Sequence, residues 1–217
     1  MLPLIRMVVA IEMMALPVWA GAVLARPGAG LGWRLARLPA AVVLLAGALL
    51  VMAALARGSA AVGILRTQAV ALGFLVFLAG LGVLVERVAG PRAAQWIVAL
   101  AGWIVVGSVV WAGPMLALLE GPAQATAAQV AVHANPMVVA EQELGLVWLR
   151  QDLTYRISPF GESYSYLVPG VAWWKTLLVH VFVGSGLLVF SLPRAKRGEG
   201  ADGRPSADRR IGPANRR

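Results

Sequence analysis

The chain has 217 residues, of which 59% are hydrophobic and 13% charged, and its mean hydropathy is +0.77. Soluble domains carry about 25% charged residues, so this chain has too few polar side chains to cover a water-exposed surface. It contains no cysteine, which excludes disulfides, thiolate metal sites and cysteine nucleophiles.

Five apolar runs approach the length of about 20 residues that a helix needs to cross a membrane. They cover residues 4–25, 38–56, 67–85, 93–119 and 170–192. The fourth run is long enough to tilt, or to break at Gly113–Pro114, because proline removes a backbone donor. The sequence therefore predicts an all-α fold, a polytopic transmembrane helix bundle with about five spans.

An alternative for the first run is a cleaved signal peptide. Arg6 precedes the apolar stretch, and the small residues Ala20 and Ala22 lie near its end. Cleavage would leave four spans. Glu12, inside the apolar stretch, argues against this alternative.

Positive charge gathers at the carboxy terminus, where residues 194–217 hold eight Lys or Arg and three acids. Low hydrophobicity predicts that this tail is disordered. Its charge is expected next to a membrane, both from topology and from attraction to anionic lipid, so we expect no nucleic-acid partner. Cytoplasmic loops retain Lys and Arg, so the tail is predicted to be cytoplasmic and the amino terminus outside.

Residues 120–169 form the only long segment between predicted spans, and we expect it to lie outside the membrane. Asn135–Pro136 is typical of a helix start, because Asn accepts from free amides and Pro is preset for the first turn. Met137, Ala140, Leu144 and Trp148 then fall on one face, which predicts an amphipathic helix. The predicted organisation is a four-span bundle (1–119), this external segment (120–169), a final span (170–193) and the tail (194–217).

Glu12 and His180 are the ionisable residues deepest in their predicted spans. Such groups are costly in lipid and commonly mark pathways or partners, so both are candidates for a pathway or gate, and they could pair as a proton relay. The alternative is that each satisfies a separate helix contact, through Ser108, Gln95 or a backbone carbonyl. The candidates in the external segment are Asn135, Pro136, Trp148, Asp152 and Tyr155.

A haem or metal at His180 is disfavoured, because the chain has only one other histidine, His133. No phosphate-binding loop, zinc-protease motif, nucleophile elbow or dinucleotide fingerprint is present, so we expect no cofactor and no enzymatic activity. An enzyme acting on lipid is a distant third possibility, since the acids of the external segment lack a recognisable spacing. Driven transport would need energy from another subunit or an ion gradient.

The stretches Ala134-Asn135-Pro136-Met137-Val138-Val139 and Tyr155-Arg156-Ile157-Ser158-Pro159-Phe160-Gly161 precede one final span and a basic end. This layout resembles the carboxy-terminal part of ABC-2 type exporter permeases, over the last third of the chain. The resemblance implies a transport role with an ATP-binding partner subunit. Those permeases typically have six spans, so the five predicted here indicate a shortened or auxiliary subunit.

The sequence thus predicts a permease or permease-like subunit in the cell inner (plasma) membrane, with other membrane subunits as partners. The competing class is a structural or assembly subunit of a larger respiratory or photosynthetic complex. Both classes predict the same spans.

Overall fold

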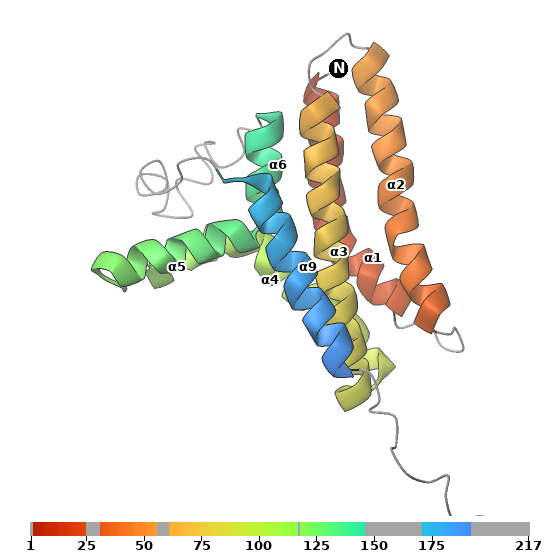
Figure 1. The fold of residues 1–217 in the computed structure, drawn as a ribbon, viewed down its shortest axis with the longest axis vertical. Helices are drawn as coiled ribbons and strands as arrows, with labels where there is room; N and C mark the ends of the chain where they lie inside the picture. The colour runs from red at the N-terminus through yellow and green to blue at the C-terminus, as the bar shows by residue number, and fades with distance from the viewer. Residues whose placement is uncertain (1, 25–30, 56–60, 117, 146–170, 192–217) are drawn as a thin grey trace, which may run out of the picture.

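The fold was analysed in a computed structural model, which describes residues 2–24, 31–55, 61–116, 118–145 and 171–191 (Figure 1). Within these ranges the regular structure is helical throughout. The helices are α1 (Leu2–Leu24), α2 (Leu31–Leu55), α3 (Ala61–Ala89), α4 (Pro91–Leu116), α5 (Gly121–Ala134), α6 (Pro136–Leu144) and α9 (Trp173–Ser191). Helices are expected of such apolar runs, because only internal hydrogen bonds satisfy the backbone in lipid.

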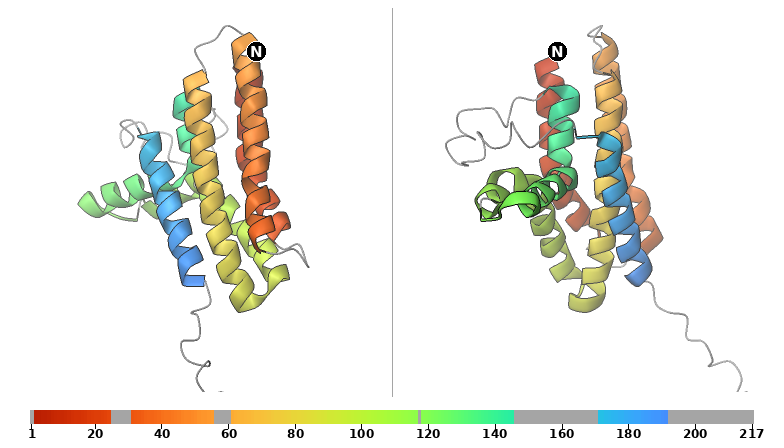
Figure 2. Two further views of the ribbon diagram at one scale, coloured as in Figure 1. Left: turned by 45° about the vertical axis from the view of Figure 1, so that its right-hand side comes forward. Right: turned by 60° about the vertical axis from the view of Figure 1, so that its left-hand side comes forward.

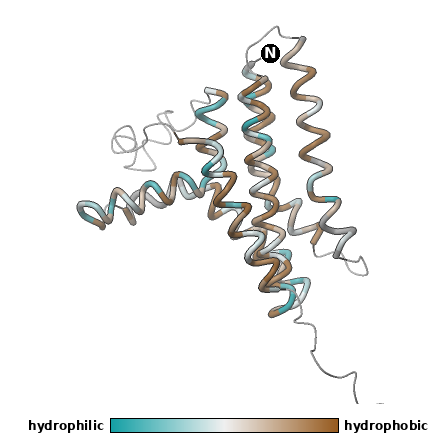
Figure 3. Tube along the Cα trace, viewed as in Figure 1, coloured by the Kyte–Doolittle hydropathy of each residue, from teal (hydrophilic) through white to brown (hydrophobic). Residues whose placement is uncertain are grey.

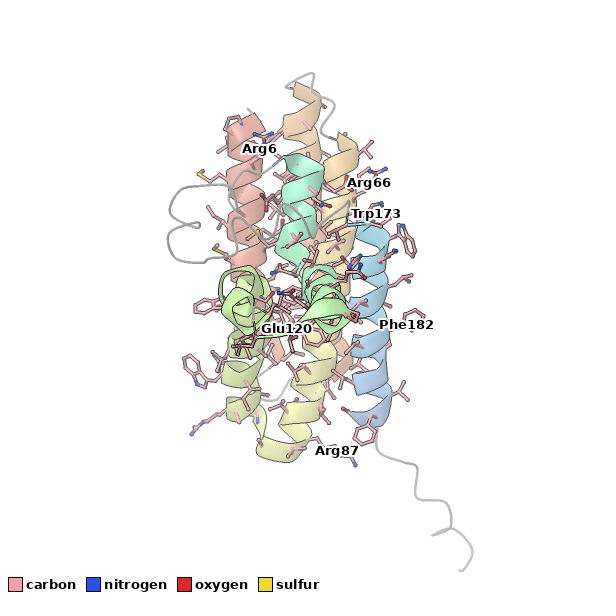
Figure 4. All side chains as sticks on the ribbon, turned by 90° about the vertical axis from the view of Figure 1, so that its left-hand side faces the viewer. Arg6, Arg66, Arg87, Glu120, Trp173 and Phe182 are labelled. Atoms are coloured by element: carbon pink, nitrogen blue, oxygen red, sulfur yellow. The ribbon has the colours of Figure 1, made fainter. Side chains whose placement is uncertain are left out.

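Four of these helices are long and apolar enough to cross a membrane. The qualifying stretches are Pro3–Leu24, Ala36–Ala54, Ala61–Ala89 and Trp173–Ser191. The fourth predicted run folds as α4, which is helical through Gly113–Pro114, but its last part turns away from the direction of the bundle (Figure 4). A membrane bundle is thus supported with four candidate spans, and the count of five stays a prediction.

The long helices run up and down the bundle in chain order, and α3 lies among the others (Figures 1 and 2). The turn from α3 to α4 is a single glycine, Gly90, with φ +85°, followed by Pro91 as the first residue of α4. Glycine adopts this left-handed conformation without strain, and proline costs no hydrogen bond at a helix start. The chain therefore reverses direction within one residue.

Helices α3 and α9 run in the same direction, and small residues bring them together. A Cβ on Gly184 would lie 2.5 Å from the carbonyl of Val76, and one on Gly80 would overlap the carbonyl oxygen of Gly184. Two turns before Gly80, Gly73 faces Leu177 and His180. We call Gly73, Gly80 and Gly184 the glycine seam. It lets two backbones approach closely, which drives helix association in membranes.

Helix α5 leaves the direction of the bundle. Figure 4 views α5 and the end of α4 nearly along their axes, about halfway between the bundle ends that carry Arg66 and Arg87. Figures 1 and 2 show α5 projecting sideways at this level. The prediction placed this segment beyond the end of the bundle, so α5 is a finding that the sequence did not reveal.

Helix α6 is shorter than the amphipathic helix predicted from Asn135 onward. It ends at Leu144 because Gly145 adopts the left-handed conformation, with φ 61° and ψ 41°. Met137, Ala140 and Leu144 of the predicted apolar face are buried, but Val138 and Val139 are buried too, so burial in α6 is not confined to that face. Trp148, Asp152, Tyr155 and the tail from residue 192 lie outside the described residues.

Candidate functional site

Glu12 lies on α1, and the structure pairs it with Gln68 of α3. The Gln68 amide donates from Nε2 to Glu12 Oε2 at 2.6 Å, and the two residues are 6% and 3% exposed. Glu12 Oε1 and Gln68 Oε1 are buried without a hydrogen-bond partner. A buried pair with two unsatisfied oxygens is costly for stability, which makes it a candidate site.

His180 lies on α9, against a different part of α3. Its ring makes an edge contact with Phe74, with centroids 5.2 Å apart, and a tilted contact with Phe77 at 5.9 Å. Nδ1 has no hydrogen-bond partner, and the backbone of Ala134, the last residue of α5, lies beside the ring. His180 therefore marks where α5 meets α9.

The structure does not join Glu12 to His180. The hydrogen bond of Glu12 goes to Gln68, and the ring contacts of His180 go to Phe74 and Phe77. Within the described residues, α3 therefore supplies neighbours to both groups separately. The suggested partner Ser108 instead accepts a hydrogen bond from Asn135.

A cleft of about 360 Å³ opens between α1 and α2 beside Glu12. We call it the α1–α2 cleft. Its walls are apolar apart from Glu12, and they include Ile11, Ala15 and Trp19 from α1 and Val42 and Leu45 from α2. Volumes of about 300–1,000 Å³ are typical of small-molecule sites, so this cleft is large enough to hold a ligand.

Asn135 is the junction of three helices and is completely buried. Its Oδ1 accepts from the amide of Met137 at 2.8 Å, which confirms the predicted Asn–Pro helix start. Its Nδ2 donates to Val106 O and Ser108 Oγ, both at 2.9 Å. Asn135 thus ends α5, starts α6 and ties both to α4, with Pro136 buried as the first residue of α6.

Arginines hold α6 to the bundle. Arg6 donates from Nε to Leu144 O at 2.7 Å, at the carboxyl end of α6, where a cation is favoured by the helix dipole. Arg66 pairs with Glu143 at 3.1 Å. Leu144 thus supplies Arg6 with a carbonyl partner within the protein.

The polar residues of α5 lie at the level of the apolar helices. Glu120, just before α5, is exposed, as are Thr126 and Gln129. Figure 3 shows hydrophilic positions along α5 where the neighbouring helices are largely hydrophobic, and Figure 4 shows Glu120 halfway along the bundle. No group of three metal-ligating side chains occurs in the described part of the chain.

Comparison with known proteins finds no match to a family model, a curated protein or a solved structure.

Proposed function

We propose that the protein is a permease or permease-like subunit of a membrane transport system, with energy coupling supplied by another subunit. The observation that carries this proposal is helix α5, which has exposed polar positions and projects sideways from the bundle at the level of apolar helices. Exposed polar groups at such a depth are costly in lipid. They are tolerated where they line a water-filled path or meet another subunit.

The buried polar groups support the same proposal. Discontinuous helices and ionisable residues near the middle of a bundle are typical of transport paths. Here Glu12 and His180 are buried at separate places around α3, and each has an atom without a partner. We assign Glu12 and His180 to the path or its gate. Each residue acts with its own local neighbours, and the two do not form one proton relay.

Membrane orientation is part of the proposal. We expect the protein in the cell inner (plasma) membrane, with its basic tail in the cytoplasm. The lack of native cysteine allows a direct test with single cysteines at Ser206 in the tail and Ser59 between α2 and α3. In intact cells, an impermeant maleimide should label Ser59→Cys only. Labelling of Ser206→Cys instead would show that the topology is the reverse of the proposed one.

The second candidate is a structural or assembly subunit of a larger membrane complex. It is favoured by the exposed face of α4, where Trp96 is 73% and Trp103 is 56% exposed. Large aromatic side chains on a helix surface suit burial against a neighbouring protein.

Purification of the tagged, full-length protein from its own membranes in mild detergent separates the two candidates. We expect a stoichiometric ATP-binding subunit whose ATPase activity in proteoliposomes changes in the presence of this chain. Glu12→Gln and His180→Gln should each impair transport by that complex. Stoichiometric recovery with redox or pigment-bearing subunits would replace the permease with the structural candidate.

A further inference from the structure

The α1–α2 cleft has a single ionisable group in its wall. That group is Glu12, and the rest of the lining is apolar side chains and the ring of Trp19. Glu12 Oε1 has no hydrogen-bond partner, and the residue is only 6% exposed. The wall of the cleft therefore contains one carboxyl, whose buried Oε1 is unsatisfied, in apolar surroundings where an electrostatic interaction is much stronger than in water.

No cation of the described chain pairs with this carboxyl. The nearest arginine along α1, Arg6, donates to Leu144 O, and Arg66 of α3 pairs with Glu143. The remaining neighbour is Gln68, an uncharged amide that occupies only Oε2. Among the described residues, Glu12 thus has an uncharged amide as its hydrogen-bond partner and no basic one.

Trp19 adds a second cation-attracting group to the same face. It follows Glu12 by seven residues, which is two helical turns, and both line the cleft. The face of an indole ring attracts cations through its quadrupole. Carboxyl and ring thus bracket an apolar space about 10 Å long.

We propose that the α1–α2 cleft is a binding site for a lipophilic organic cation. The apolar body of the ligand fills the space between α1 and α2, and its positive charge is balanced by the Glu12 carboxyl. The proposal names a class of ligand. It rests on the proposed function only for the idea that the bound cation is also transported. Binding is measured on the isolated protein, so its failure is distinguishable from failure of the permease proposal.

The test uses the full-length protein in detergent micelles and radiolabelled tetraphenylphosphonium as the probe, with affinity measured by equilibrium dialysis. We expect saturable binding to the native protein and a Kd at least tenfold higher for Glu12→Gln. Ala15→Phe, which fills the cleft and keeps the carboxyl, should weaken binding to a similar degree. The matched control Glu143→Gln removes a carboxylate outside the cleft and should change the Kd by less than twofold.

Tetraphenylborate, an anion of nearly the same shape, decides whether charge matters. It should show no saturable binding that depends on Glu12. Equal affinity for both probes, equal affinity of native protein and Glu12→Gln, or the absence of saturable phosphonium binding would each overturn the proposal. If Glu12→Gln fails to fold, Ala15→Phe and Val42→Phe carry the test, and unchanged affinity in both would reject the site.

Discussion

Two helix pairs of the bundle, α3–α9 and α1–α2, differ in how closely they pack. Toward α9, the glycine seam brings backbone against backbone and leaves no room for a Cβ at Gly80 or Gly184. Between α1 and α2 the helices leave the α1–α2 cleft, and Gly47 on α2 has nothing within 4 Å of a Cβ position. The bundle thus combines a tightly packed side with a side that has room for a ligand, and unsatisfied Glu12 lies on the open side.

The largest effect should come from adding a methyl group to the glycine seam. Gly184→Ala places a Cβ against the Val76 carbonyl, where backbone cannot give way, and should lower the free energy of unfolding by about 3 kcal/mol. Thermal unfolding in detergent, followed by tryptophan fluorescence, measures the loss.

Two glycines provide matched controls for that substitution. Gly186 on α9 and Gly47 on α2 have open space at the Cβ position, so alanine there should raise stability by about 0.5–1 kcal/mol. If Gly184→Ala and Gly186→Ala unfolded at the same temperature, the close packing of the glycine seam would be contradicted.

Asn135 is a second closely packed point of the bundle, at the junction of α4, α5 and α6. Asn135→Ala removes hydrogen bonds to Met137, Val106 and Ser108 and should cost about 2–3 kcal/mol. Chemical denaturation monitored by circular dichroism gives the value. The control Gln129→Ala alters an exposed side chain of α5 and should stay close to native stability, and an equally small effect at Asn135 would show that the junction is not rigid.

Gln68→Leu tests the buried polar pair beside the α1–α2 cleft. It removes the hydrogen bond to Glu12 and leaves the carboxyl wholly unsatisfied, at a cost of about 1–2 kcal/mol. The double variant Glu12→Met/Gln68→Leu should recover that loss or exceed native stability, because apolar groups replace both partners. If the double variant were instead less stable than Gln68→Leu alone, the pair would be a stabilising element.

Arg66→Ala should have the smallest effect. The pair with Glu143 is partly solvent-exposed, with Arg66 at 45% and Glu143 at 17%, so its loss should cost about 0.5 kcal/mol. Unfolding at low and high ionic strength measures it, since salt should reduce the difference between native protein and variant. A loss above about 2 kcal/mol would make the attachment of α6 a main determinant of stability.

Helix positions were largely predictable, because length and hydrophobicity of an apolar run are local properties. The third run was predicted over 67–85, whereas α3 covers Ala61–Ala89. The prediction stopped at charges that the fold accommodates, since Arg66 pairs with Glu143 and Arg87 donates to Ser191 O. Asn135 was also found in advance, because capping by Asn–Pro depends on neighbours in sequence.

Partners across the bundle were not predictable. Gln68 was missed as the partner of Glu12 because the choice depends on which helices are adjacent and on their rotation. Helix α5 was missed because Ala, Gln and Thr dominate it and give no clear apolar face. The α1–α2 cleft depends on how far two helices stand apart, which no single sequence segment encodes.

The parallel arrangement of α3 and α9 has a consequence for synthesis. Arg87 and Ser191, which meet at one end of this helix pair, are 104 residues apart in the chain. At translation rates of 5–20 residues per second, about 5–20 seconds separate their emergence from the ribosome. During that interval the newly inserted α3 faces lipid along its glycines, so the nascent protein depends on the insertion machinery or on lipid contacts until its last helix arrives.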